Sequence, residues 1–111
     1  MPDPVRVLLD GSVPEKLRLA FSTQLTVETV RYRGWNGLKN GELLRAAEAD
    51  FDVLVTVDKG LCHQQNVGER DIAVVVLDAN GTTYSDLVGL VAEAERACHQ
   101  STPGRVVIVK G

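Results

Sequence analysis

Cysteine, aromatic residues and long hydrophobic runs are all scarce in this chain of 111 residues. Its two cysteines, Cys62 and Cys98, are far apart, which argues against both a zinc knuckle and a secreted disulfide scaffold. No apolar run approaches the roughly 18 residues that a membrane span needs. The first residues carry an acid and two prolines rather than the charged head and apolar core of a signal peptide. We therefore expect a cytoplasmic protein with reduced thiols and no membrane partner.

Basic residues are also too few for net charge alone to indicate a nucleic-acid binder. The chain has 12 Lys and Arg against 15 Asp and Glu, a formal net charge of -3. Many nucleic-acid-binding domains are strongly basic, although a local basic patch can attract RNA without a basic total. The length predicts one domain that spans residues 1–111 and buries most of its apolar surface.

Short apolar runs alternate with helical patterns along the whole chain. Runs rich in β-branched residues predict strands over residues 5–9, 26–32, 53–57, 72–77 and 105–109. Apolar residues at helical spacing predict helices over residues 15–21, 42–49, 59–65 and 84–99. Two of the strands are almost continuously apolar, which is typical of strands that are covered on both faces. The pattern predicts an α/β fold, a three-layer α/β/α sandwich with a mostly parallel five-stranded sheet.

Carboxylates stand where three of the predicted strands end. Asp10 follows the first strand, Asp58 the third and Asp78 the fourth, and Glu42 opens a predicted helix. Ligands of open parallel sheets bind outside the carboxyl ends of the strands. Carboxylates held close together repel one another unless a cation lies among them, and oxygen ligands suit Mg²⁺ or Mn²⁺. The pattern predicts an acidic metal site, in which the ion can activate water against a phosphodiester.

Each acid also has a purely structural interpretation. Asp10 could form a turn or cap the following helix, and Ser12 could cap that helix instead. Asp58 could cap a short helix, and Asp78 opens a sequence typical of turns. Glu42 could simply interact with the positive end of its own helix.

Three stretches of the chain resemble the small bacterial PIN-like domains, which are relatives of the PIN-domain toxins. They are Leu9-Asp10, residues 34–44 (GWNGLKNGELL) and residues 55–66 (VTVDKGLCHQQN), and the resemblance covers essentially the whole chain. The threonine-x-aspartate motif at Thr56 is its most specific part. The resemblance implies a PIN-like ribonuclease that uses Mg²⁺ or Mn²⁺ to hydrolyse RNA phosphodiesters, as the toxin of a toxin–antitoxin pair. It also implies an antitoxin protein and a second copy of the chain as partners.

The resemblance assigns roles to particular residues. Asp10, Glu42 and Asp58 take the positions of the catalytic acids and metal ligands. Asp78 is the substitute for the last ligand of the family, and Thr56 would orient the site. The residues expected to contact RNA are Thr56, Lys59, His63 and Lys39.

Further basic residues are expected around the same edge of the sheet. They either hold an RNA backbone or form a solvated surface. Trp35 either stacks on a base or closes the core beneath its glycine-rich loop. The basic residues are Lys16, Arg31, Arg33, Lys39, Arg45 and Lys59.

Departures from the family pattern leave two other hypotheses open. Gly11 and Ser12 stand where relatives carry an acid and an Asn, and Asn40 stands where many carry Asp. The second hypothesis is therefore a catalytically degenerate PIN-like fold that acts as a binding or interaction module. The third is a receiver-like signalling domain, in which Asp58 would accept a phosphoryl group and Lys110 would be the lysine that follows the fifth strand.

Overall fold

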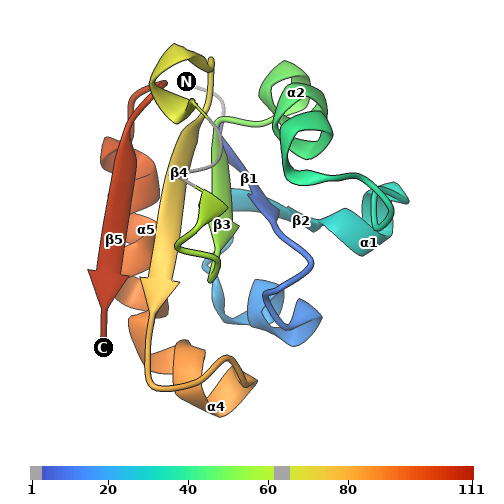
Figure 1. Ribbon diagram of the computed structural model, residues 1–111. Coiled ribbons are helices and arrows are strands. Elements are labelled where there is room, and N and C mark those ends of the chain that lie inside the picture. The colour runs from blue at the N-terminus through green and yellow to red at the C-terminus, as the bar shows by residue number, and fades with distance from the viewer. Residues whose placement is uncertain (1–3, 62–65) are drawn as a thin grey trace.

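Five parallel strands form the centre of the molecule, as the alternating pattern predicted (Figure 1). The computed structural model describes residues 4–61 and 66–111. The strands lie in the order β2-β1-β3-β4-β5, and every neighbouring pair is parallel. Their carboxyl ends therefore share one edge of the sheet. The strands are β1 (Val5–Leu9), β2 (Leu25–Thr29), β3 (Val53–Thr56), β4 (Ala73–Asp78) and β5 (Val106–Lys110).

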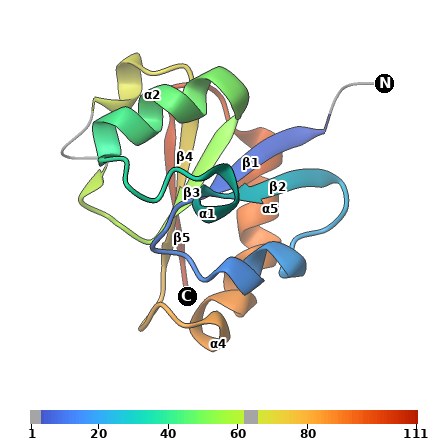
Figure 2. The same ribbon diagram turned by 90° about the vertical axis from the view of Figure 1, so that its right-hand side faces the viewer.

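Helices cover both faces of the sheet (Figure 2). Successive strand residues point to opposite faces, so Val7 and Leu9 enter one apolar layer and Leu8 enters the other. All three side chains are fully buried, which explains the nearly continuous apolar runs. One layer contains η1 (Glu15–Ala20), α4 (Tyr84–Leu87), η3 (Val88–Leu90) and α5 (Val91–Gln100), and the other contains α1 (Val30–Arg33), α2 (Asn40–Asp50) and η2 (Val67–Glu69).

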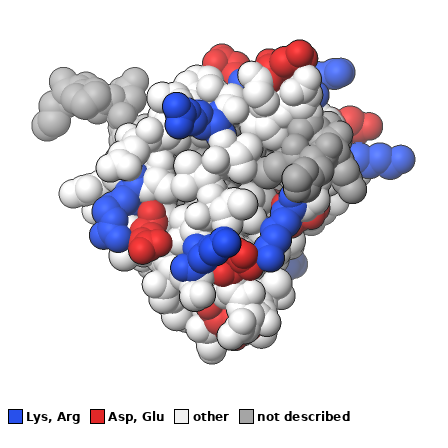
Figure 3. Space-filling view, turned by 60° about the vertical axis from the view of Figure 1, so that its left-hand side comes forward, with Lys and Arg blue, Asp and Glu red and all other residues white. Residues whose placement is uncertain are grey.

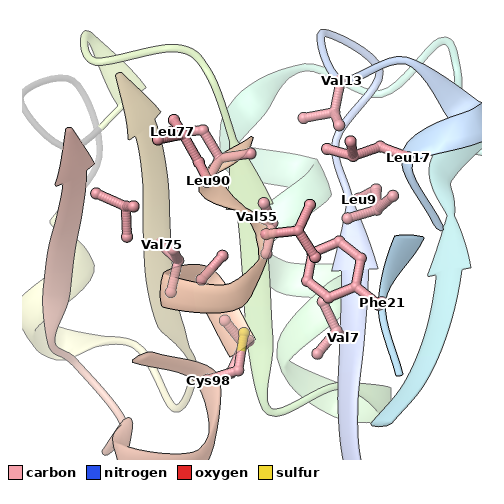
Figure 4. Packing of buried hydrophobic residues seen from close by; sticks show 14 of the residues in the cluster. Val7, Leu9, Val13, Leu17, Phe21, Val55, Val75, Leu77, Leu90 and Cys98 are labelled. Atoms are coloured by element: carbon pink, nitrogen blue, oxygen red, sulfur yellow. The ribbon is translucent and has the colours of Figure 1, made fainter. Parts of the chain in front are cut away.

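In the layer beneath α5, side chains of the helices pack against side chains of the strands (Figure 4). Leu9 lies with Leu17 of η1, and Leu77 lies with Leu90 of η3. Cys98 of α5 is buried in the same layer. This burial, with a smaller contribution from the charge of Glu95, raises the pKa of the Cys98 thiol to about 12. Cys98 is therefore a protonated core residue rather than a reactive thiolate.

The second strand is shorter than its sequence predicts. The prediction of a strand over residues 26–32 is wrong beyond Thr29, whose hydroxyl accepts the N–H of Tyr32 at 3.0 Å and begins α1. Gly34 ends this short helix with a φ of 73°, a conformation that glycine adopts more easily than other residues. The β-branched composition of the run conceals this cap, because Thr favours both a strand and an N-cap.

The predicted helices keep their places but differ in form. The helix expected over residues 84–99 is divided into α4, η3 and α5, and Gly89 lies at the division. Thr83 and Asp86 form a capping box that begins α4. The segment at 15–21 is the 3-10 helix η1, and the prediction at 59–65 lies largely outside the described residues. Across residues 4–61 and 66–111, none of the helices has both the length and the apolar character to span a bilayer.

Arg33 ties the end of α1 to β2 and α2. Its Nε donates to Oε1 of Glu28 at 2.8 Å and its Nη1 donates to Oδ2 of Asp50 at 3.0 Å. The bond to Glu28 raises the pKa of Arg33 above its ordinary value. The guanidinium also lies 4.8 Å from the ring centroid of Phe51 and 5.3 Å from that of Trp35. Trp35 packs edge-on against Phe51, so it helps to close the core.

One side of the molecule is formed by the edge strand β5. Val106 and Ile108 are 37% and 51% exposed there, because α2 does not extend over this strand. The middle of this side is largely uncharged, with basic and acidic side chains around it (Figure 3). The strands β1 and β3, by contrast, are internal, and the candidate site forms where they end.

Candidate functional site

Asp10 and Thr56 lie at the point where the direction of the chain connections changes. From β1 the chain passes to β2 on one side, and β3 then lies on the other side of β1. The crevice at the carboxyl ends of two such strands is where open α/β sheets bind ligands. Asp10 directly follows β1 and Thr56 is the last residue of β3. The backbone N–H of Asp10 donates to the carbonyl of Val55 at 2.9 Å and fixes the two strand ends side by side.

A buried hydroxyl joins the two predicted catalytic acids that follow these strands. Thr56 is fully buried, and its Oγ1 donates to Oδ2 of Asp10 at 2.6 Å. The same oxygen accepts the backbone N–H of Asp58 at 3.0 Å. Thr56 therefore orients the Asp10 carboxylate and holds the start of the loop that carries Asp58.

Ser12 is a member of this cluster that sequence reasoning did not find. Its hydroxyl donates to Oδ2 of Asp10 at 2.9 Å and accepts the N–H of Val57 at 3.4 Å. The interpretation of Asp10 or Ser12 as a helix cap is wrong, since Pro14 occupies the N-cap of η1 and no side chain caps it. A hydroxyl two residues after a strand-end Asp was the only signal available, and it fits a turn equally well.

The Asp58 side chain begins its own loop with a local bond. Its Oδ1 accepts the N–H of Gly60 at 2.8 Å, an Asx turn that needs no other element. The residue is otherwise exposed. Asp10 and Asp58 thus each have one carboxylate oxygen in a protein hydrogen bond. For their other oxygens, Oδ1 of Asp10 and Oδ2 of Asp58, the described part of the chain provides no hydrogen-bond partner.

Asp78 is paired with a lysine. Its Oδ1 lies 2.8 Å from Nζ of Lys59, and its backbone carbonyl accepts the N–H of Gly111 at 2.8 Å. Asp78 and Lys59 were predicted to be a metal ligand and an RNA contact, and the structure joins them to each other. The ammonium group of Lys59, the residue after Asp58, therefore pairs with the carboxylate of Asp78 at the end of β4.

The remaining predicted site residues are less closely connected. Helix α2 ends at Asp50 just before β3 begins, so its first turn, with Lys39 as N-cap and Glu42, lies toward the carboxyl ends of the strands. Both side chains are exposed, and neither forms a hydrogen bond or ion pair with any other described residue. His63 lies outside the described residues.

The donor chemistry of the cluster suits a hard cation. Within residues 4–61 and 66–111, no three His, Cys, Asp or Glu side chains converge as a metal site. The cluster instead offers the Asp10 carboxylate beside two hydroxyls, one of which also holds the backbone N–H of Asp58. Mg²⁺ is commonly held by one or two carboxylates, with water and substrate phosphate as its other ligands. Asp10 and Asp58 are therefore the residues that would hold such an ion.

A small hollow of ≈ 250 Å³ opens beside Asp10. We call it the Asp10 hollow, and its wall includes Gly11, Glu15, Thr29 and Arg31. Its volume is below the roughly 300–1,000 Å³ of most small-molecule pockets. It has the size for a hydrated ion or a phosphate group rather than a whole nucleotide.

Comparison with protein-family models, with curated proteins and with solved structures found no match to this chain.

Proposed function

We propose that this chain is a PIN-like ribonuclease that uses Mg²⁺ or Mn²⁺ and has Asp10 and Asp58 at its centre. The observation that carries the proposal is the Thr56 hydroxyl, which bonds both to the Asp10 carboxylate and to the backbone of Asp58. This buried hydroxyl fixes the Asp10 carboxylate and the backbone that carries Asp58 at the edge where parallel sheets bind ligands, which supports the proposal. Glu42, from the first turn of α2, would contribute to the same site.

Different residues would have different roles in the proposed reaction. Thr56 and Ser12 hold Oδ2 of Asp10, so the other oxygen, Oδ1, would bind the ion. Asp58, fixed by its Asx turn, would supply the second carboxylate. A bound divalent ion would activate a water and stabilise charge on the phosphodiester. Lys59, which neutralises Asp78, would stand next to the backbone of the RNA.

One observation favours the alternative, a PIN-like fold that binds a partner without catalysis. Lys59 engages Asp78, and only two of the predicted acids are linked through Thr56 in the described residues. Fewer available carboxylates weaken the binding of a divalent ion. In that case the same edge of the sheet would bind RNA or a protein and leave it intact.

Titration with Mn²⁺ by calorimetry, followed by incubation with single-stranded RNA, tests both proposals. We expect Mn²⁺ binding and metal-dependent cleavage by the wild-type chain, and loss of both in Asp10→Asn and Asp58→Asn. Asp71→Asn is the matched control, because Asp71 is an exposed acid that precedes β4 at the opposite edge of the sheet.

The other outcomes also decide between the proposals. RNA binding without cleavage in any metal would support the binding module. No heat of Mn²⁺ binding, together with no cleavage, would overturn the nuclease proposal. Cleavage that persists in Asp10→Asn would indicate a contaminating enzyme or a different centre.

A further inference from the structure

Tyr32 is unusually exposed for an aromatic residue. Its side chain is 80% exposed, the most of any large hydrophobic side chain in the described residues. Aromatic rings in water are favoured binding elements, because they offer a large flat apolar face at little cost in conformational entropy. Tyr32 lies in α1, which begins directly after β2 and therefore at the same edge of the sheet as Asp10.

The backbone beneath Tyr32 is held in place. Its N–H donates to the Thr29 hydroxyl at 3.0 Å. The N–H of Gly34 donates to the carbonyl of Arg31 at 3.0 Å and ends the helix. The side chain of Arg33, the residue after Tyr32, donates hydrogen bonds to Glu28 and Asp50. The Tyr32 ring is thus exposed on a short, well-anchored turn.

A second hollow, which we call the Tyr32 hollow, lies beside this ring and next to the Asp10 hollow. It encloses ≈ 530 Å³ and is lined by residues that include Arg18, Arg31 and Tyr32. It shares Glu15, Thr29 and Arg31 with the Asp10 hollow, so the two lie side by side. The Tyr32 hollow falls within the roughly 300–1,000 Å³ of small-molecule sites. The Tyr32 hollow therefore has the volume for a nucleotide, and the Asp10 hollow has the volume for a phosphate group.

Two glutamates and two arginines line the Tyr32 hollow, and each glutamate already has a basic partner. Glu28 is already paired with Arg33 at 2.8 Å. Glu15 lies 3.9 Å from Arg31, and this pair is exposed, with side-chain exposures of 47% and 75%. Because both side chains are exposed, this ion pair is weak, so a phosphate can replace Glu15 as the partner of Arg31. Arg18 lines the same hollow and adds a second positive charge.

We propose that the Tyr32 hollow binds one nucleotide of a single-stranded RNA next to the phosphodiester that lies at Asp10. The base stacks on the ring of Tyr32, and Arg31 and Arg18 contact the phosphates on either side. An aromatic platform beside basic side chains is the general means by which proteins hold unpaired bases. This inference rests on the proposed ribonuclease function, for which it names the substrate class and the residues that recognise it.

Binding measured without cleavage tests the inference. The probe is a single-stranded RNA of ten nucleotides with mixed sequence and a 5′-fluorescein label, followed by fluorescence anisotropy in EDTA. Stacking contributes about 1–3 kcal/mol per base, so Tyr32→Ala should weaken binding by roughly 5- to 150-fold. Tyr32→Phe and Tyr32→Trp keep an aromatic face and should stay within about twofold of the wild type. Because Tyr32 is 80% exposed, these variants are expected to fold normally, which circular dichroism checks.

Two further measurements separate stacking from general attraction. Tyr84→Ala, at the other described and exposed tyrosine, is the matched control and should bind like the wild type. Arg31→Ala should reduce the slope of log K against log salt by about 0.7, the value for one phosphate contact on a single strand. A fully paired RNA duplex should bind more weakly than the single strand, since its bases are already stacked within the helix.

The outcomes distinguish this inference from the proposed function. Equal RNA affinity of Tyr32→Ala and the wild type overturns the inference, as does an equal loss in Tyr84→Ala, whether or not the protein cleaves RNA. Binding that depends on Tyr32 in a protein with no metal-dependent cleavage supports the nucleotide site and overturns the nuclease. The absence of any RNA binding overturns the inference, and cleavage assays then judge the nuclease separately.

Discussion

The hydroxyl of Thr56 lies 2.6 Å from Oδ2 of Asp10, across the boundary between β3 and β1. The two residues are separated by 46 positions in the chain, and the parallel pairing of their strands brings them together. Because Thr56 is fully buried and Asp10 is partly exposed, this bond joins the core of the sheet to the edge where the strands end.

We expect Thr56→Val to separate the shape of this residue from its hydroxyl. Valine fills the same space but leaves the N–H of Asp58 without its acceptor and Asp10 with the Ser12 hydroxyl alone, which should lower the free energy of unfolding by about 1–3 kcal/mol. The affinity for Mn²⁺ should also fall several-fold. Urea denaturation and calorimetry measure the two effects, with Thr56→Ser as the control that keeps the hydroxyl. Unchanged Mn²⁺ affinity in Thr56→Val would show that the bond does not orient a metal ligand.

Removal of the Lys59 charge should strengthen the binding of a divalent cation. Lys59 neutralises Asp78 at 2.8 Å, so Lys59→Gln frees that carboxylate and removes a repelling charge next to Asp58. We expect Mn²⁺ to bind roughly 2- to 10-fold more tightly, the scale of one unit charge at a few ångströms in water. Lys16→Gln on η1 is the matched control. Weaker Mn²⁺ binding in Lys59→Gln would instead mean that the lysine holds Asp78 in position.

The Cys98 thiol should make the protein less stable in alkali. Its pKa rises from 9.0 to about 12 on folding, so above pH 9 the unfolded chain releases a proton that the folded chain retains. The free energy of unfolding should therefore fall by up to about 1.4 kcal/mol for each pH unit between these values, and the contribution is intact below pH 9. Denaturation of the wild type and Cys98→Ala at pH 8 and pH 10.5 isolates this effect. Parallel losses in both proteins would contradict it.

Arg33 should not tolerate a change to lysine. A lysine retains the charge but cannot bond Glu28 and Asp50 from one planar group while it lies over Phe51. We expect Arg33→Lys to lower the free energy of unfolding by about 1–3 kcal/mol in urea denaturation. Arg96→Lys, on the exposed side of α5, should change it by less than about 0.5 kcal/mol. Similar values for the two variants would show that the charge of Arg33 alone matters.

Gly104 should be the least replaceable glycine among those described. Its φ is +83°, and an added Cβ would lie 2.9 Å from the backbone oxygen of Gly68. We expect Gly104→Ala to lower the free energy of unfolding by more than about 1 kcal/mol. Gly37→Ala has nothing within 4 Å of its new Cβ and should be neutral or slightly stabilising. Thermal denaturation of both variants checks this difference.

The sequence predicted the strands better than the contacts between them. Continuous β-branched runs identify buried parallel strands such as β3, because both faces must be apolar. The end of β2 was missed, since Thr29 serves the strand and the helix cap equally well. The position of Asp10 after the first strand correctly predicted that it lies at the edge of the sheet where the strands end. Its bond to Ser12 could not be predicted, because it depends on the exact path of a turn.

The pairing of Lys59 with Asp78 shows a second limit of sequence reasoning. Each residue lies at or just after the end of its own strand. A local sequence pattern does not show which acid a long basic side chain will pair with. Such pairs depend on strand order, and several orders are compatible with the same alternation of strands and helices. Lys59 and Asp78 meet because β3 and β4 are neighbours in the sheet.

The strand order also has a consequence for synthesis of the protein. Of the five strands, β1 is made first, yet it lies between β2 and β3, so both its edges are paired only after Thr56 has been made. Until then its apolar side chains lack one neighbouring strand, and α5, which covers them, is made much later. Such non-local pairing slows folding and prolongs the exposure of apolar surfaces that promote aggregation. The apolar layer over β1 can therefore close only once α5 has been made, although Asp10 and Thr56 can meet as soon as β3 exists.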